Sequence, residues 1–303
     1  MHWLLSTPET FSLRELVRRC GRRYPPPLRA VASGQQLLRV EGLGTGTVLG
    51  VTIEQVPSGL VLRTDSRLSG QETEETSQKI WRMLRLEEDL APFVRLAARA
   101  DALGSVKTRG ARLIRGTTLF EDVLTSMTVV WDLDGTPDYS VTASLVNGLG
   151  LPLPSNPTLH AYPTPARLRS NPAQLSGLLG EEVATRVSAV AIAFEERSGQ
   201  IETLVRRPLS TAELSSRLTA LLPLSAAALG QLMLRIGRYD YVPTDALACA
   251  RLRRYLGLPA EPTERAVEAF FDPWHPWGGL AYWIWDWSKV AEPNGITASP
   301  TTA

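Results

Sequence analysis

The sequence has too few cysteines and histidines for several classes of metal and redox protein. Its 303 residues include two cysteines, Cys20 and Cys249, and three histidines, His2, His160 and His275. Two cysteines exclude a disulfide framework and a four-cysteine iron–sulfur cluster. The histidines are scattered and have no metal-ligand spacing. We therefore expect no bound metal and no cofactor.

Long apolar runs are also missing from the chain. No stretch of about 18 consecutive apolar residues is present. The N-terminus does not combine a basic segment with an apolar run, as a signal peptide does. These absences predict a cytoplasmic protein with no membrane partner.

The chain carries little net charge, but its arginines are unevenly distributed. The formal net charge is +1, yet residues 206–256 contain eight arginines and three acids. Arginine suits bidentate phosphate contacts, and a local basic surface supplies salt-dependent affinity for nucleic acid. A solvated helix face is the alternative explanation. The eight are Arg206, Arg207, Arg217, Arg235, Arg238, Arg251, Arg253 and Arg254.

The residue pattern divides the chain into a β-rich part and a helical part. Short β-rich runs at residues 36–40, 47–53 and 59–64 are separated by glycine, proline and serine, which predicts a small antiparallel sheet. A helical pattern begins near Thr76, and almost everything after Thr117 is helical. The predicted fold class is therefore α+β.

Local signals predict three further helix starts. They lie at Thr164, Ser210 and Thr263, and Glu213 completes a capping box with Ser210. Each of these hydroxyl side chains can accept a hydrogen bond from the first helical turn.

The domain boundaries follow from the same pattern. We expect an N-terminal α+β domain at residues 1–105 and a helical domain at residues 106–290. Within the helical domain, residues 132–139 and 151–157 are expected to be loops. The Pro/Ser/Thr-rich residues 291–303 are expected to be a disordered tail.

The stretch Gly237–Asp245 places a carboxylate at a predicted helix start. Asp245 directly follows Pro243 and Thr244. A helix N-terminus favours aspartate because free backbone N–H groups and the positive end of the helix dipole face it. A carboxylate there suits an enzyme whose transition state is positively charged. The alternative is an N-cap with no catalytic role.

Five segments share their residue types and order with the motifs of one known family. They are Leu86–Phe93, Gly110–Glu121, Tyr162–Pro165, Gly237–Asp245 and Trp274–Trp283. In this order they resemble the helix-hairpin-helix DNA glycosylases, and within them the 3-methyladenine DNA glycosylase II type. The resemblance implies a small antiparallel, TBP-like N-terminal domain followed by an all-α glycosylase domain with its hairpin at residues 213–243.

The resemblance also implies an activity and a partner. Enzymes of this type are monofunctional DNA glycosylases that flip a damaged base out of duplex DNA and hydrolyse its N-glycosidic bond in base excision repair. Asp245 matches the catalytic aspartate, which stabilises the oxocarbenium-like sugar for attack by water. The expected substrate is an alkylated or related purine in double-stranded DNA. The expected protein is a nucleoid-associated monomer.

A flipped base needs a pocket with aromatic faces. A positively charged alkylated purine gains about 1–2 kcal/mol from stacking on electron-rich rings. Core packing of an amphipathic final helix is the alternative for each aromatic residue. The candidates are Trp131, Tyr239, Trp274, Trp277, Tyr282 and Trp283, of which Trp131 and Tyr239 are preferred.

The hairpin sequence departs from the family pattern. Residues 222–230 lack the two glycines that let backbone N–H groups approach a DNA phosphate. The position of the Schiff-base lysine in bifunctional relatives is Ala227 or Ala228, and alanine cannot form an imine. No AP lyase activity is therefore expected. The candidate DNA contacts are Thr128, Ser225, Ala226, Ala228, Arg238 and Arg251.

A second departure lies at residues 125–131. Relatives place a Gln or Asn here that enters the gap left by the flipped base, and Thr128 is the nearest, shorter stand-in. The altered hairpin leaves open a second interpretation, a catalytically weak or inactive relative that binds distorted duplex. A third, a helical interaction protein unrelated to DNA, requires the five ordered motifs to be coincidental.

Overall fold

The computed structural model describes residues 1–9, 11–20, 23–31, 35–98, 100–104, 106 and 111–289. The tail predicted to be disordered at residues 291–303 lies outside these ranges, as does Gly110 of the second motif. The predicted domain boundary at 105–106 falls beside residues that are not described, and it stays a prediction.

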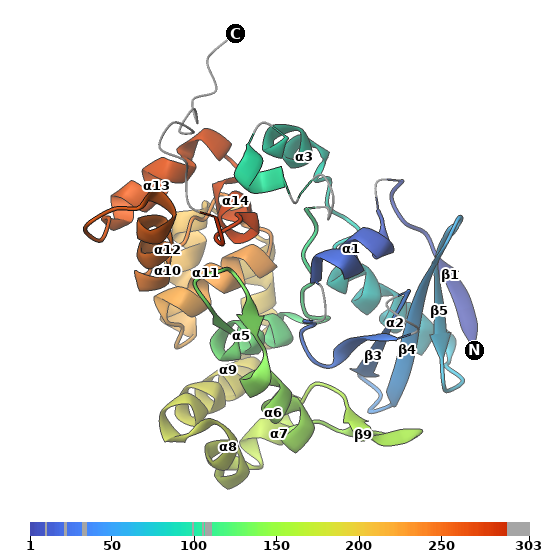
Figure 1. Cartoon of the computed structure of the whole chain (residues 1–303). Helices are drawn as coiled ribbons and strands as arrows, with labels where there is room; N and C mark the ends of the chain where they lie inside the picture. Colours follow the sequence, from blue (N-terminus) through green and yellow to red (C-terminus); the bar gives the residue numbers. More distant parts are fainter. Residues whose placement is uncertain are drawn as a thin grey trace.

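The N-terminal region forms one antiparallel sheet with strand order β1-β5-β4-β3-β2 (Figure 1). Its strands are β1 His2–Leu5, β2 Leu28–Val31, β3 Gln36–Gly42, β4 Val48–Val56 and β5 Gly59–Thr64. The three central strands confirm the predicted runs. The two edge strands escape prediction because each has four residues, too few to show alternation.

Two helices, α1 Leu13–Cys20 and α2 Gly70–Met83, pack on one face of this sheet (Figure 1). Alternate β4 residues Leu49, Val51 and Ile53 are fully buried in the shared core. A strand with one covered face requires this alternation. The hydrophobic pattern of β4 therefore sets which side of the sheet the helices cover.

The rest of the described chain is mainly helical (Figure 1). Its α-helices are α3 Ala91–Ala97, α5 Leu119–Thr128, α6 Ser140–Leu149, α7 Pro165–Arg169, α8 Pro172–Leu179, α9 Glu181–Arg206, α10 Thr211–Leu221, α11 Ala226–Arg235, α12 Ala246–Leu256, α13 Glu264–Phe271 and α14 Gly278–Ile284. Two 3₁₀ turns, η2 Asp101–Leu103 and η3 Asp272–Trp274, separate some of them. A sheet followed by helices confirms the predicted α+β class.

Both segments predicted as loops contain short strands. β6 Val130–Trp131 pairs with β7 Pro137–Asp138, and β8 Pro152–Leu153 pairs with β9 Asn156–His160. The loop predictions were wrong at residues 137–138, 152–153 and 156–157. β7 and β8 have two residues each, too few to carry a periodic signal, and β9 begins with Asn156 and Pro157, which are typical of turns.

The three predicted helix starts are confirmed. The hydroxyls of Thr164, Ser210 and Thr263 accept hydrogen bonds from backbone N–H groups in the first turns of α7, α10 and α13. At α10 the Glu213 side chain accepts a 2.6 Å hydrogen bond from Arg217. It therefore faces Arg217 rather than closing the predicted capping box.

Buried charges join the sheet to the helical region. Arg39 of β3, 2% exposed, pairs with Glu41 at 2.9 Å and with Glu121 of α5 at 2.7 Å. Thr117 and Lys79 also hydrogen-bond these carboxylates. Burial raises the pKa of Glu41, but Arg39 and Lys79 outweigh it and hold that pKa below its usual range. This charged network fixes α5 against the sheet.

Two further features of the described residues bear on partners. None of their helices has both the length and the hydropathy needed to cross a bilayer. Within the same residues, no group of three or more His, Cys, Asp or Glu side chains is arranged to hold a metal ion.

Candidate active site and DNA interface

Asp245 is the N-cap of α12. Its Oδ1 accepts a 2.9 Å hydrogen bond from the N–H of Ala248. The residue is partly exposed, and no partner is found for Oδ2 among the described residues. One carboxylate oxygen therefore anchors the side chain, while the other has no hydrogen-bond partner among the described residues.

The loop that carries Asp245 is hydrogen-bonded to the α9–α10 connection and to α14. α11 ends at Arg235, and Gly237 two residues later has a φ of +84°, which few residues other than glycine adopt. The Arg238 guanidinium donates to the carbonyl oxygens of Leu209 and Arg207 at 3.0 and 3.2 Å. The N–H of Gly279 in α14 donates to the Tyr239 carbonyl at 2.7 Å. Helix ends far apart in sequence thus position this corner.

Gly279→Ala is expected to displace the corner, since a Cβ at this position would collide with the backbone carbonyl of Tyr241. Backbone cannot yield as a side-chain end does, so we expect unfolding free energy to fall by about 1–3 kcal/mol. Gly177→Ala in α8 is the matched control, because its Cβ would meet nothing within 4 Å; that helical variant should gain about 0.5–1 kcal/mol. Urea unfolding measures both, and equal stabilities would refute the positioning role of Gly279.

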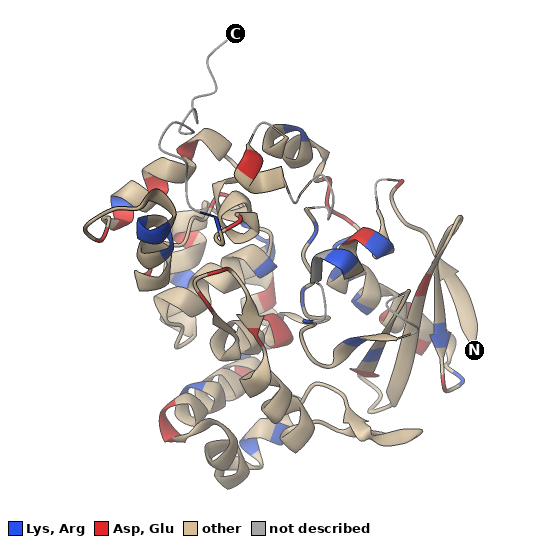
Figure 2. Ribbon diagram, viewed as in Figure 1, with Lys and Arg blue, Asp and Glu red and all other residues tan. Residues whose placement is uncertain are grey.

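The surroundings of Asp245 are acidic. Burial raises the pKa of Tyr241, and Asp245, Glu268 and Glu264 raise it further. Burial likewise raises the pKa of the Cys249 thiol, with contributions from Glu261, Glu264 and Asp245. The carboxylates of Asp245, Glu261, Glu264 and Glu268 therefore act electrostatically on this part of the molecule, and their negative charge favours a cation there. Over the whole molecule, positively and negatively charged residues are interspersed (Figure 2).

Arg251 lies inside the fold behind Asp245. It is 1% exposed, donates to the Tyr282 hydroxyl at 2.9 Å and to the Asp132 carbonyl at 2.7 Å, and lies over the Trp283 ring. This predicted DNA contact therefore fastens α14 and the β6–β7 turn to α12. Its position does not fit a role in binding phosphate.

The aromatic candidates fall into separate groups. Trp131 packs on Trp283 with ring centroids 4.9 Å apart, and Trp131 is half-buried. Trp274 and Tyr282 are 5% and 1% exposed, and both pack against Phe271 of α13. Burial raises the pKa of Tyr282 to about 12. Trp131 is thus partly exposed, whereas Trp274, Tyr282 and Trp283 are buried. It lies close to α12.

Tyr239 and Trp277 stack 5.5 Å apart at an interplanar angle of 27°. The Tyr239 hydroxyl accepts a 2.7 Å hydrogen bond from Arg85 and donates to Glu88. Burial raises the pKa of Tyr239, and Glu88 adds to it against the opposing charge of Arg85. The hydroxyl is therefore engaged by the segment after α2, whereas Trp277 is partly exposed.

The hairpin between α10 and α11 keeps an exposed helix N-terminus despite its missing glycines. Ser225 is the N-cap, and its hydroxyl accepts from the N–H of Ala228 at 3.2 Å. Ala226 and Ala227 are exposed, but Ala228 is buried. The N–H groups of Ala226 and Ala227 are the ones that an anion can approach here.

The other two predicted DNA contacts are occupied elsewhere. The Thr128 hydroxyl is buried and hydrogen-bonds the Leu124 carbonyl at 2.8 Å and Thr142 at 2.7 Å. The Arg238 guanidinium binds the backbone carbonyls of Arg207 and Leu209 between α9 and α10. Neither position fits the role that the sequence suggested.

Sequence reasoning overlooked two exposed apolar side chains beside α12. Val130 of β6 is 59% exposed and Leu133 is 38% exposed. Strand alternation turns Trp131 inward and Val130 outward. Arg254 of α12 donates to the Leu133 carbonyl at 2.9 Å and pairs with Asp134 at 2.7 Å. The β6–β7 turn is thus held to the helix that Asp245 begins. A short strand predicted directly after Thr128 would have indicated that Val130 and Trp131 point to opposite sides.

Several solved structures share this architecture. The 8-oxoguanine glycosylase/lyase of Clostridium acetobutylicum matches with a TM-score of 0.66 and 14% identity over 94% of this chain and 97% of that chain. The 3-methyladenine DNA-glycosylase of Archaeoglobus fulgidus matches with a TM-score of 0.66 and 14% identity over 94% and 96%. MBOgg1 in complex with a low-affinity DNA ligand matches with a TM-score of 0.66 and 16% identity over 94% of both chains.

No protein-family model and no curated protein sequence matches the chain. The structural matches nevertheless cover nearly the full length of both partners. They confirm the predicted fold, which the chain shares with these solved glycosylases.

Proposed function

We propose that the protein is a monofunctional DNA glycosylase that removes positively charged alkylated purines from duplex DNA in base excision repair. The observation that carries this proposal is the carboxylate of Asp245, held at the N-terminus of α12 among further carboxylates in a glycosylase fold. A negative site stabilises a cationic base and a cationic sugar alike.

The chemistry assigned to Asp245 needs one free oxygen. As the glycosidic bond breaks, the electron pair leaves with the purine and positive charge develops on the sugar. Oδ1 is held by the Ala248 N–H, and Oδ2 faces the developing charge. Water then attacks C1′ and gives up a proton, leaving an abasic site. No covalent bond to the protein is needed.

The number and positions of the lysines support the absence of lyase activity. The sequence contains three lysines, Lys79, Lys107 and Lys289. Lys79 pairs with Glu41 and Lys289 with Asp286, and Lys107 lies outside the described residues. The hairpin carries alanine at both candidate positions, Ala227 and Ala228. These features support base removal without imine-based strand cleavage.

One assay tests this function. Purified protein is incubated with duplexes that carry 3-methyladenine, 7-methylguanine, ethenoadenine, hypoxanthine, uracil or 8-oxoguanine, and abasic sites are then cleaved with alkali. Release of the two cationic methylpurines is expected, with strand breaks only after alkali. Breaks before alkali, or release confined to 8-oxoguanine, would contradict the proposal.

A second candidate function is binding of distorted duplex without turnover. The glycine-free hairpin is the observation that favours it. Retained binding to an abasic-site duplex with no base release from any substrate would select this alternative.

We further assign Val130 as the side chain that fills the gap left by the flipped base. Proteins that open DNA insert apolar side chains between base steps, and Val130 is outward and anchored beside α12. Val130→Ala is expected to slow release from duplex about tenfold while leaving release from single strands unchanged. Val94→Ala on α3, 36% exposed, is the matched control. Equal rates for both variants on duplex would rule out Val130.

A further inference from the structure

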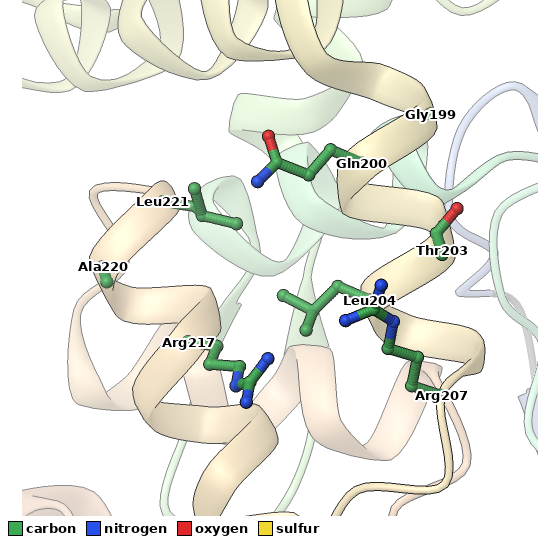
Figure 3. Close-up of a pocket in the computed structure, with 8 residues that line it drawn as sticks. All are labelled: Gly199, Gln200, Thr203, Leu204, Arg207, Arg217, Ala220 and Leu221. Carbon is green, nitrogen blue, oxygen red and sulfur yellow. The ribbon is translucent and has the colours of Figure 1, made fainter.

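The described residues contain a hollow away from Asp245, between α9 and α10. Its volume is about 600 Å³. Its lining residues are Gly199, Gln200, Thr203, Leu204, Arg207, Arg217, Ala220 and Leu221. Figure 3 shows the side chain of Arg207, which directly follows α9, and that of Arg217 of α10 reaching toward Leu204. We refer to this hollow as the α9–α10 groove.

The arginines that the sequence suggested as a phosphate-binding surface differ in burial and in their partners. Arg235 and Arg251 are buried, and Arg238 and Arg254 donate to backbone carbonyls. Arg207 and Arg253 are exposed, and neither has an ion pair among the described residues. Arg206 and Arg217 are exposed and each pairs with a glutamate one turn away on its own helix. Two of these four exposed arginines, Arg207 and Arg217, line the α9–α10 groove.

The groove offers the groups that an anionic ligand with an apolar body requires. Guanidinium groups bind phosphate through parallel hydrogen bonds. Gln200 and Thr203 add an amide and a hydroxyl, while Leu204 and Leu221 provide apolar surface. Arg217 already binds Glu213 at 2.6 Å, but this pair is exposed and therefore weak. A volume of about 600 Å³ exceeds what one phosphate fills and suits a whole nucleotide.

The groove adjoins the hairpin. It ends at Leu221, and the next residues, Leu222–Ser225, form the turn into α11. Arg217 precedes Leu222 by five residues, or about 8 Å along the helix axis. A strand whose backbone lies at the exposed Ala226 can therefore extend toward the α9–α10 groove.

We propose that the α9–α10 groove binds one nucleotide unit of a DNA strand, with its phosphate on Arg207 and Arg217 and its sugar against Leu204 and Leu221. The identity of the strand as DNA rests on the proposed function. The groove would supply a phosphate contact beside a hairpin that lacks its glycines.

The test is the salt dependence of binding to a labelled duplex with an abasic site, which requires no base release. In the full chain, Arg207→Gln with Arg217→Gln is expected to weaken binding about tenfold at 0.1 M NaCl. The slope of log K against log salt should become shallower by about 0.9, the value for one phosphate contact. Arg169→Gln with Arg186→Gln removes two glutamate-paired arginines outside the groove, whose side chains are 61% and 39% exposed, and should keep the wild-type slope.

The outcomes separate the two proposals. Equal slopes for both double variants would overturn the groove proposal, whether or not the wild type releases bases. A wild type that binds with the groove-dependent slope but releases no base would support the groove and refute catalysis. Tighter groove-dependent binding of free deoxyadenosine monophosphate than of the duplex would overturn DNA as the occupant.

Discussion

Asp245→Asn is expected to lower the rate of base release by about 100- to 1000-fold, the usual loss when one stabilising group is removed from a transition state. Asparagine is as good an N-cap as aspartate, so the hydrogen bond to the Ala248 N–H can persist. The variant loses the negative charge and little else. Single-turnover release of 7-methylguanine from duplex measures the rate, and binding to an abasic-site duplex should stay within about twofold of wild type.

A cap control separates catalysis from stability. Thr263→Ala removes the N-cap of α13, whose hydroxyl accepts from the Ala266 N–H at 3.3 Å. This variant should lose about 1 kcal/mol of unfolding free energy and keep the wild-type rate. If Asp245→Asn releases base at the wild-type rate, Asp245 is a cap without a catalytic role.

Arg39→Met is expected to lower the free energy of unfolding by about 3–5 kcal/mol, because it leaves two buried carboxylates without their shared partner. Arg39 is 2% exposed and contacts Glu41 and Glu121 at 2.9 and 2.7 Å. The two carboxylates belong to the sheet and to α5, so both regions should lose stability together. Urea unfolding, followed by tryptophan fluorescence and circular dichroism, measures the change.

The exposed pair Arg63–Glu54 is the control for this variant. Its side chains are 52% and 35% exposed and 3.5 Å apart, so Arg63→Met should cost less than about 1 kcal/mol. Adding Glu121→Gln to Arg39→Met should restore part of the loss, since one unpaired charge is removed. Similar losses for Arg39→Met and Arg63→Met would show that the buried network contributes no more than a surface pair.

The same network predicts how stability depends on pH. The folded-state pKa of Glu41 lies below its unfolded value. Its stabilisation is therefore fully present above about pH 4.3 and is lost as the pH falls through the folded pKa. In Arg39→Met the folded-state pKa of Glu41 rises towards its unfolded value, so Glu41 protonation should cost less folding stability as the pH falls, and the unfolding free energy should depend less steeply on pH below about 4.3 than in the wild type. Unfolding free energies from pH 3 to 7 test this, and equal slopes below about pH 4.3 would contradict it.

Local signals determined a good part of the fold. The central strands, the caps at Thr164, Ser210 and Thr263, and Asp245 at the start of α12 all follow from residues within one turn or one strand. A cap needs only a side-chain oxygen and an N–H three residues later, so the sequence contains both partners.

The roles of the motif residues depended on distant contacts. Arg112 and Arg115 of the second motif donate to carbonyls of residues 82–88, and Glu121 binds Arg39. The motifs therefore predicted the fold correctly, although these residues join the sheet to the helices instead of touching a substrate. Charge is visible in a sequence, whereas the partner of a charge is not.

By itself, the sequence determined the α+β architecture, the position of Asp245 at a helix start and the lack of a lysine in the hairpin. Only the tertiary structure decided that Arg238 and Arg251 are structural, that Thr128 is buried and that Val130 and the groove arginines face outward. The physical reason is the distance along the chain over which each interaction acts. Caps and alternation act between near neighbours, while the burial of Arg251 depends on Asp132, 119 residues away, and on the packing of α14.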